Sequence, residues 1–82
     1  MRLMEFKMER TGLLTVGQEV TVTESQLPTS FYYTIGPAIA MSKNYPAYQR
    51  LKSRTGIVKE IETKPRGFYT LVAFDEEPVD ET

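Results

Sequence analysis

Cationic and aromatic side chains alternate along one stretch in the middle of this sequence. Residues 43–66 include seven basic and two acidic side chains, whereas residues 67–82 include no basic and five acidic ones. Cations neutralise phosphates and tyrosine rings stack on unpaired bases, so this mixture has the chemistry needed to bind nucleic acid. The candidate nucleic-acid-binding residues are Lys43, Tyr45, Tyr48, Arg50, Lys52, Arg54, Lys64 and Arg66.

Each of these residues also has a purely structural interpretation. The basic middle and the acidic end can pair with each other within a small fold, and exposed ion pairs contribute little free energy. Tyr45 and Tyr48 can line the core while their hydroxyl groups reach water. Lys64 and Arg66 flank a turn, where charged side chains can serve solubility alone.

A second candidate site is the aromatic segment of residues 31–41. Its candidate protein-binding residues are Phe31, Tyr32, Tyr33 and Ile35, followed by Pro37, Ile39 and Met41. Aromatic and methionine side chains are enriched at protein interfaces, so this segment favours an alternative function in protein binding. The competing interpretation is that the segment completes the core, because a chain of 82 residues needs its large apolar side chains.

The sequence offers little for catalysis. It has no cysteine and no histidine, so the thiolate nucleophile, the commonest general base and the commonest zinc ligand are all missing. It also has no glycine-rich phosphate loop and no nucleophile elbow. The carboxylates Asp75, Glu76 and Glu77 begin a polar tail, without the spacing and glycine of a calcium loop. We therefore predict a non-catalytic protein with no cofactor and no metal site.

Residues 55–75 have the pattern of two β-strands joined by a tight turn. Apolar runs flank the segment Lys64-Pro65-Arg66-Gly67, in which proline presets φ at the second turn position and glycine suits the last. Two more strands are predicted upstream, because apolar and polar residues alternate there with a period of two. The first contains Met4, Phe6 and Met8, and the second follows Gly17 and contains Val20 and Val22.

Residues 24–54 form a long insertion in this succession of strands. Within it, residues 31–35 favour a short strand, and residues 45–53 favour a short helix with a proline in its first turn. Such a helix would place Tyr48 and Leu51 on its inner face and the two arginines of the segment together on another face.

The fold class predicted from these segments is mainly β, a small barrel of about five strands with little helix. Residues 1–75 are expected to form a single domain that includes the insertion, and residues 76–82 an acidic, disordered tail. In the last strand Tyr69, Leu71 and Ala73 share one face, and the opposite face is apolar as well. We expect one of these faces to be covered by the insertion or by a second chain.

Three motifs carry a resemblance to a known plan. They are Val16-Gly17-Gln18-Glu19-Val20, Thr55-Gly56-Ile57-Val58 and Tyr69-Thr70-Leu71-Val72-Ala73-Phe74-Asp75. The chain resembles small SH3-like barrels of the KOW type and the many short phage or mobile-element proteins that share their plan. The resemblance implies a module that binds RNA, DNA, a nucleoprotein complex or another protein. The alternative within this class is an adaptor or a small phage inhibitor whose acidic tail mimics nucleic acid.

Hydropathy and charge also bear on location. No apolar run approaches the roughly 20 residues needed to span a bilayer. The N-terminal segment MRLMEFKMER is too charged for the apolar region of a secretory signal. We therefore expect a cytoplasmic protein that does not enter the membrane.

Overall fold

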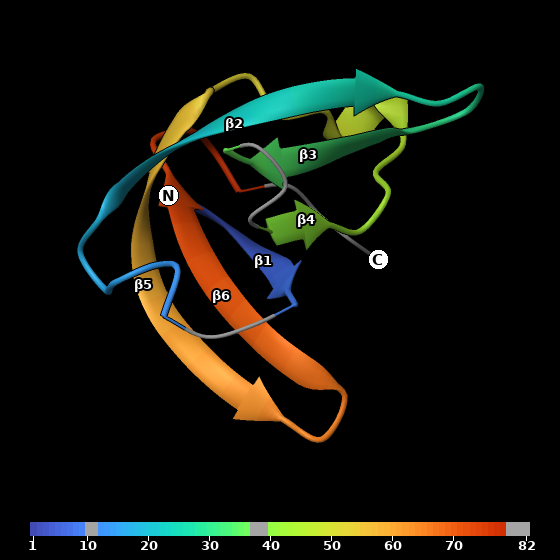
Figure 1. Ribbon diagram of the computed structural model, residues 1–82. Helices are drawn as coiled ribbons and strands as arrows, with labels where there is room; N and C mark the ends of the chain where they lie inside the picture. The colour runs from blue at the N-terminus through green and yellow to red at the C-terminus, as the bar shows by residue number, and fades with distance from the viewer. Residues whose placement is uncertain (10–11, 37–39, 79–82) are drawn as a thin grey trace.

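The computed structural model describes residues 1–9, 12–36 and 40–78 and folds them into a closed antiparallel β-barrel (Figure 1). Around the barrel the strands follow the order β1-β4-β3-β2-β5-β6, and β6 pairs with β1 to close it. The elements are β1 (Arg2–Met8), β2 (Glu19–Gln26), β3 (Phe31–Ile35), β4 (Ala40–Ser42), a 3₁₀ helix η1 (Ala47–Gln49), β5 (Thr55–Lys64) and β6 (Gly67–Phe74). The predicted fold class is confirmed, and the architecture is compatible with a small SH3-like barrel.

The predicted hairpin is the longest continuous feature of the barrel. β5 and β6 pair from Gly56↔Phe74 to Lys64↔Gly67, with an irregularity between Val58 and Glu60. Gly67 has a φ of 140°, a region that side chains with a Cβ rarely adopt, so glycine is required at this end of the turn. In Figure 1 the tip of this hairpin extends away from the rest of the barrel.

β1 contributes to the core because buried and exposed side chains alternate along it. Every second residue from Arg2 to Met8 is buried and the residues between them are exposed, as the period of two predicts. Phe6 packs against Phe74 of β6 with ring centroids 6.3 Å apart. The core also includes Val20, Val22, Tyr33, Ile35, Leu51, Val58 and Val72.

The insertion contributes more strand and less helix than expected. Its predicted strand is β3, and β4 is an additional short strand that pairs with both β1 and β3. The predicted helix is reduced to the single turn η1, because Pro46 before it and Arg50 after it have extended backbones. The expectation that Tyr48 and Leu51 share an inner face is wrong: Leu51 is 1% exposed and Tyr48 is 79% exposed.

Among residues 1–9, 12–36 and 40–78, no helix has the length and apolar character required to cross a membrane.

Candidate functional site

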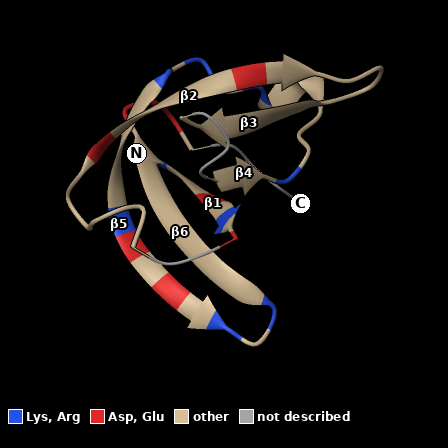
Figure 2. Ribbon diagram, in the orientation of Figure 1, with Lys and Arg blue, Asp and Glu red and all other residues tan. Residues whose placement is uncertain are grey.

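Five of the six predicted cationic residues lie at two separate ends of the barrel. Lys64 and Arg66 lie at the tip of the β5–β6 hairpin, whereas Arg50, Lys52 and Arg54 follow η1 at the opposite end. Figure 2 shows this division, with Lys and Arg at the hairpin tip and again around the far end of the molecule. The eight predicted residues therefore do not form one continuous surface.

Four of the predicted residues gather around one hollow. Tyr48, Arg50, Lys52 and Arg54, which we call the Tyr48 cluster, line an open hollow of about 470 Å³ together with Ala47 and Leu51. Tyr48 is the most exposed of the large apolar side chains in the part of the chain that the structure describes. An exposed aromatic ring and three cations thus border the same depression.

Glu24, on β2, fixes the two arginines of the cluster. Its carboxylate accepts hydrogen bonds from Arg50 Nε and Nη2, the shortest of them 2.7 Å, and lies 3.5 Å from Arg54 Nη2. The Arg50 guanidinium also lies 4.6 Å from the centroid of the Phe31 ring. Half of each arginine side chain nevertheless stays exposed, 53% for Arg50 and 44% for Arg54. The guanidinium groups are therefore oriented and still accessible.

A buried tyrosine connects this carboxylate to the core. The Tyr33 hydroxyl donates a hydrogen bond to Glu24 Oε2 (2.8 Å) and accepts one from the backbone N–H of Leu51 (2.7 Å). Burial, together with the hydrogen bond to Glu24, raises the pKa of Tyr33. The hydrogen bond from Arg50 is the main reason that the pKa of Glu24 lies below its usual 4.5, with Tyr33 adding to the effect against the opposing influence of burial. The ionised carboxylate is the stable form here.

A second carboxylate holds the same loop from the other side. Glu76 Oε1 accepts hydrogen bonds from the backbone N–H groups of Lys52 (3.0 Å) and Ser53 (2.8 Å). Burial works to raise the pKa of Glu76, but these bonds and the charge of Arg2 outweigh it and leave the pKa below its usual value. Glu76 is the first residue of the predicted tail, of which residues 79–82 lie outside the described part.

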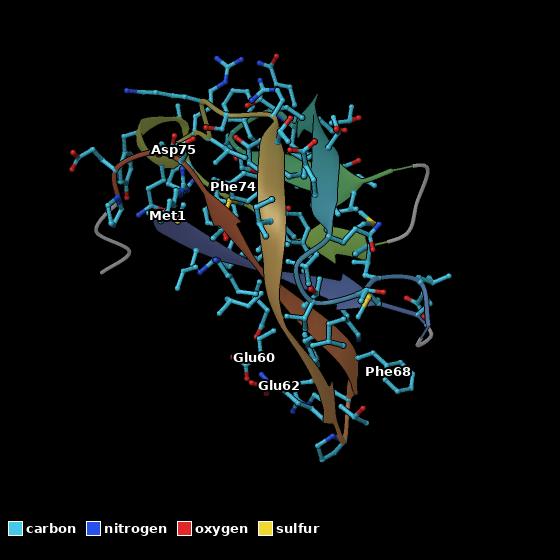
Figure 3. The ribbon with its side chains drawn as sticks, turned by 90° about the vertical axis from the view of Figure 1, so that its left-hand side faces the viewer. Met1, Glu60, Glu62, Phe68, Phe74 and Asp75 are labelled. Carbon is cyan, nitrogen blue, oxygen red and sulfur yellow. The ribbon has the colours of Figure 1, made fainter. Side chains whose placement is uncertain are left out.

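Arg2 completes this support from inside the barrel. Its side chain is 2% exposed, Nη2 donates a 2.6 Å hydrogen bond to the carbonyl of Gln49, and Nη1 lies 3.6 Å from Glu76 Oε2. Its guanidinium also lies 5.4 Å from the centroid of the Tyr45 ring. Arg2 therefore joins β1 to η1 and to the segment after β6, and Figure 3 shows Met1 and Asp75 close together at this end.

The other predicted residues have different surroundings. Tyr45 is 2% exposed and packs against Tyr33, so its ring is part of the core, and Lys43 Nζ lies 5.3 Å from its centroid. Lys64 at the hairpin tip forms ion pairs with Glu5 (3.1 Å) and Glu62 (3.8 Å). Arg66 is exposed in the turn.

The aromatic segment contributes mainly to the interior. Tyr33 and Ile35 are at most 2% exposed, so their side chains offer no surface to a partner. Phe31 is half-buried and lies against the Arg50 guanidinium, and Tyr32 is half-buried. Met41 is 49% exposed on β4. Pro37 and Ile39 lie outside the described residues.

Sequence reasoning missed the three residues that hold the cluster in place: Arg2, Glu24 and Glu76. Arg2 has the same parity as Met4, Phe6 and Met8, so extending the period-two pattern by one step would have placed it inside the barrel. No local pattern marks Glu24 or Glu76, because their partners in the loop after η1 are 23 or more residues away in the chain.

Chemically, the Tyr48 cluster can stack on a flat ring and donate hydrogen bonds to anionic oxygens. Within the described ranges, no group of three or more carboxylates is arranged to hold a metal ion. The chain matches no protein-family model, no curated protein and no solved structure.

Proposed function

We propose that this protein is a non-catalytic β-barrel that binds single-stranded nucleic acid, free or within a nucleoprotein complex, through the Tyr48 cluster. One base would stack on the ring of Tyr48. Lys52 and the exposed parts of Arg50 and Arg54 would contact the phosphates on either side of that base.

The observation that carries the proposal is the exposure of Tyr48 beside three cations. A tyrosine ring that is 79% exposed contributes almost nothing to the core of the barrel. Base stacking on an aromatic ring contributes about 1–3 kcal/mol per base and tolerates any sequence. A single strand suits this arrangement better than a duplex, because the bases of a duplex are already stacked on one another.

The charge around the hollow supports a modest affinity. Glu24 offsets part of the charge of Arg50 and Arg54, so about two or three phosphates can be neutralised. Neutralisation of so few phosphates corresponds to a Kd of about 10⁻⁴ to 10⁻⁶ M. The affinity should fall about tenfold when the salt concentration rises from about 50 to about 200 mM. Orientation of the arginines by Glu24 lowers the entropy lost on binding.

We also propose that this chain is an SH3-like barrel of the KOW type and that it belongs with the short phage or mobile-element proteins that share this plan. Barrels of this plan bind RNA, DNA or protein, and the surface used is set by their loops. In this chain the insertion between β2 and β5 supplies the loop that carries the cluster.

Fluorescence anisotropy with short labelled single strands and duplexes tests the proposal. We expect Tyr48→Ala to weaken binding of single strands about tenfold, and Lys52→Ala to lower the slope of log K against log salt by about 1. Tyr48→Phe keeps the ring and should bind like the wild type. Lys59→Ala removes an exposed cation of β5 that does not line the hollow, and it should also bind like the wild type. No binding at low salt, or equal affinities for Tyr48→Ala and wild type, would overturn the proposal.

A further inference from the structure

The loop after η1 presents two backbone N–H groups that converge on one acceptor. The N–H groups of Lys52 and Ser53 both donate to Glu76 Oε1, over 3.0 and 2.8 Å. Successive backbone N–H groups that point to one place form a concave site for an anion, such as a carboxylate or a phosphate. The loop therefore contains an anion site, and the carboxylate of the chain's own Glu76 occupies it.

Arg2 lies beside this site and has hydrogen-bonding capacity that Glu76 does not use. Its Nη1 lies 3.6 Å from Glu76 Oε2, which is close enough for an ion pair but too long for a good hydrogen bond. Among the described residues, neither Nη1 nor Nε has a hydrogen-bond acceptor, although the side chain is 2% exposed. A buried donor without an acceptor costs free energy. An anion with more oxygen atoms than a carboxylate would give Nη1 an acceptor and still bind the two N–H groups.

One side chain attaches the segment after β6 to this loop. Residues 75–78 are the described part of the acidic end, and we call them the strap. Asp75, Glu77 and Pro78 are exposed, whereas the side chain of Glu76 is only 12% exposed. In the described part of the chain, the hydrogen bonds between the strap and the loop all end at the Glu76 carboxylate. Displacement of this carboxylate would therefore release the strap.

We propose that the two N–H groups and the Arg2 guanidinium form a phosphate subsite, which Glu76 closes until a phosphate group takes its place. The strap is then an autoinhibitory contact beside the Tyr48 cluster, because Lys52 lines the hollow and its N–H belongs to the subsite. A phosphate group is the ligand that fits, because it replaces the negative charge that Glu76 places beside Arg2 and adds oxygen atoms that accept hydrogen bonds.

This inference rests on the proposed function for the source of the phosphate group, which is the bound single strand. Free inorganic phosphate has the same chemistry and is therefore a simple probe of the subsite. While the strap is closed, the apparent affinity of either ligand is lowered by the fraction of molecules in which the subsite is open. Removal of the Glu76 carboxylate should therefore strengthen binding, whereas a carboxylate that only supports the loop would weaken binding when removed.

Titration of the ¹⁵N-labelled full chain with inorganic phosphate, at an ionic strength held constant with chloride, tests the subsite. We expect saturable shifts of the Lys52 and Ser53 amide resonances. The apparent affinity should be about tenfold higher in Glu76→Ala than in wild type, as for a strap that is closed in about nine molecules of ten. Glu77→Ala is the matched control, because it removes the same charge from an exposed side chain of the strap and should bind phosphate like the wild type.

Two further variants make this comparison specific. Arg2→Met, added to Glu76→Ala, removes the guanidinium and should abolish the gain in phosphate affinity. Circular dichroism checks that each barrel is folded, and Glu76→Gln, which keeps the volume and one acceptor oxygen, repeats the comparison if Glu76→Ala unfolds. Equal or weaker binding after removal of the Glu76 carboxylate, an equal gain in Glu77→Ala, or no shift of the Lys52 and Ser53 amides would each overturn the proposal.

Fluorescence anisotropy with a labelled single strand identifies the source of the phosphate. We expect Glu76→Ala to bind the strand about three- to tenfold more tightly than Glu77→Ala does. A gain for inorganic phosphate without a gain for the strand would assign the subsite to free phosphate and overturn the inhibition of strand binding by the strap. Failure of the proposed function is a separate result, because it appears as strand binding that Tyr48→Ala leaves unchanged, whereas inorganic phosphate has no ring to stack on Tyr48.

Discussion

Arg2 is a cation inside a small barrel, and its position explains why the loop after η1 has a defined shape. It contacts the carbonyl of Gln49 and the carboxylate of Glu76, and Glu76 in turn binds the backbone of Lys52 and Ser53. Arg2 Nε and Nη1 are buried without a hydrogen-bond acceptor among the described residues. Such a cation is expensive to bury, so its value lies in fixing one arrangement of the surrounding segments.

We expect Arg2→Ala to lower the free energy of unfolding by about 2–4 kcal/mol, because it leaves a cavity and an unpaired carbonyl. Arg2→Met fills most of the volume without charge and should retain more of the stability. Urea denaturation followed by circular dichroism measures both. Equal stability of Arg2→Ala and wild type would show that the contacts of Arg2 contribute nothing to the fold.

Glu24 predicts a specific dependence on pH. Its pKa is lower in the folded protein than its usual 4.5, so its stabilising effect is present above that value and is lost as the pH falls through the folded pKa. We expect Glu24→Gln to be less stable than wild type near neutral pH and to lose less stability on acidification.

Denaturation midpoints at about pH 7 and about pH 3 provide the measurement. Glu77→Gln is the control, because Glu77 is exposed and has no ion pair among the described side chains. If Glu24→Gln and wild type lose the same free energy of unfolding between these two pH values, the ionised Glu24 carboxylate does not stabilise the fold.

At the scale of elements, the close approach of β5 and β6 depends on one glycine. A Cβ built on Gly56 would lie 2.7 Å from Val72 Cγ1, 2.8 Å from the carbonyl oxygen of Ala73 and 2.9 Å from Phe74 Cδ1. These contacts are too short for any side chain, and one of them is with backbone that a change of rotamer cannot relieve.

We expect Gly56→Ala to destabilise the barrel by about 1–3 kcal/mol through overpacking. Its neighbour Thr55 is exposed at the start of the same strand, so Thr55→Ala should change stability much less. Thermal unfolding of the two variants compares them directly. A Gly56→Ala protein as stable as Thr55→Ala would show that the strands separate at this point without cost.

The strands that could be predicted from the sequence are those with strong local patterns. The β5–β6 hairpin has its own turn residues, β1 alternates over its whole length, and β3 is rich in aromatic residues. β4 has three residues and no local pattern, because it is defined by its pairing with β1 and β3. The predicted helix at 45–53 is reduced to the single turn η1 for a similar reason: the contacts of Arg50 with β2 and of Leu51 with β3 favour an extended chain after this turn.

The candidate site, like the fold, could be predicted only where a local sequence pattern marks it. The alternation of cations and aromatics identified Tyr48, Arg50, Lys52 and Arg54, which do share a hollow. It also included Tyr45, which is buried, and two cations of the hairpin tip, which lie at the other end of the barrel. The residues that share the hollow are separated from the others by the long-range pairing of strands, and a local sequence pattern carries no information about that pairing.

At the scale of the whole molecule, the Tyr48 cluster and the tip of the β5–β6 hairpin lie at opposite ends of the barrel. We therefore expect the double substitution Lys64→Ala with Arg66→Ala to leave the affinity for a short oligonucleotide within about twofold of wild type. Tyr48→Ala should weaken it about tenfold. Fluorescence anisotropy of the two variants compares these effects, and an equal loss of affinity in both would contradict this independence.

Chemical-shift mapping locates the surface of the barrel that a single strand contacts, and thereby tests binding through the Tyr48 cluster. Amide resonances of the ¹⁵N-labelled protein would be followed during titration with a short single-stranded oligonucleotide at low salt. We expect the largest shifts in residues 47–54, reversed by added salt, with no comparable shifts at Lys64 and Arg66. Shifts centred on the hairpin tip or elsewhere on the barrel, or no shifts at all, would contradict binding through the Tyr48 cluster.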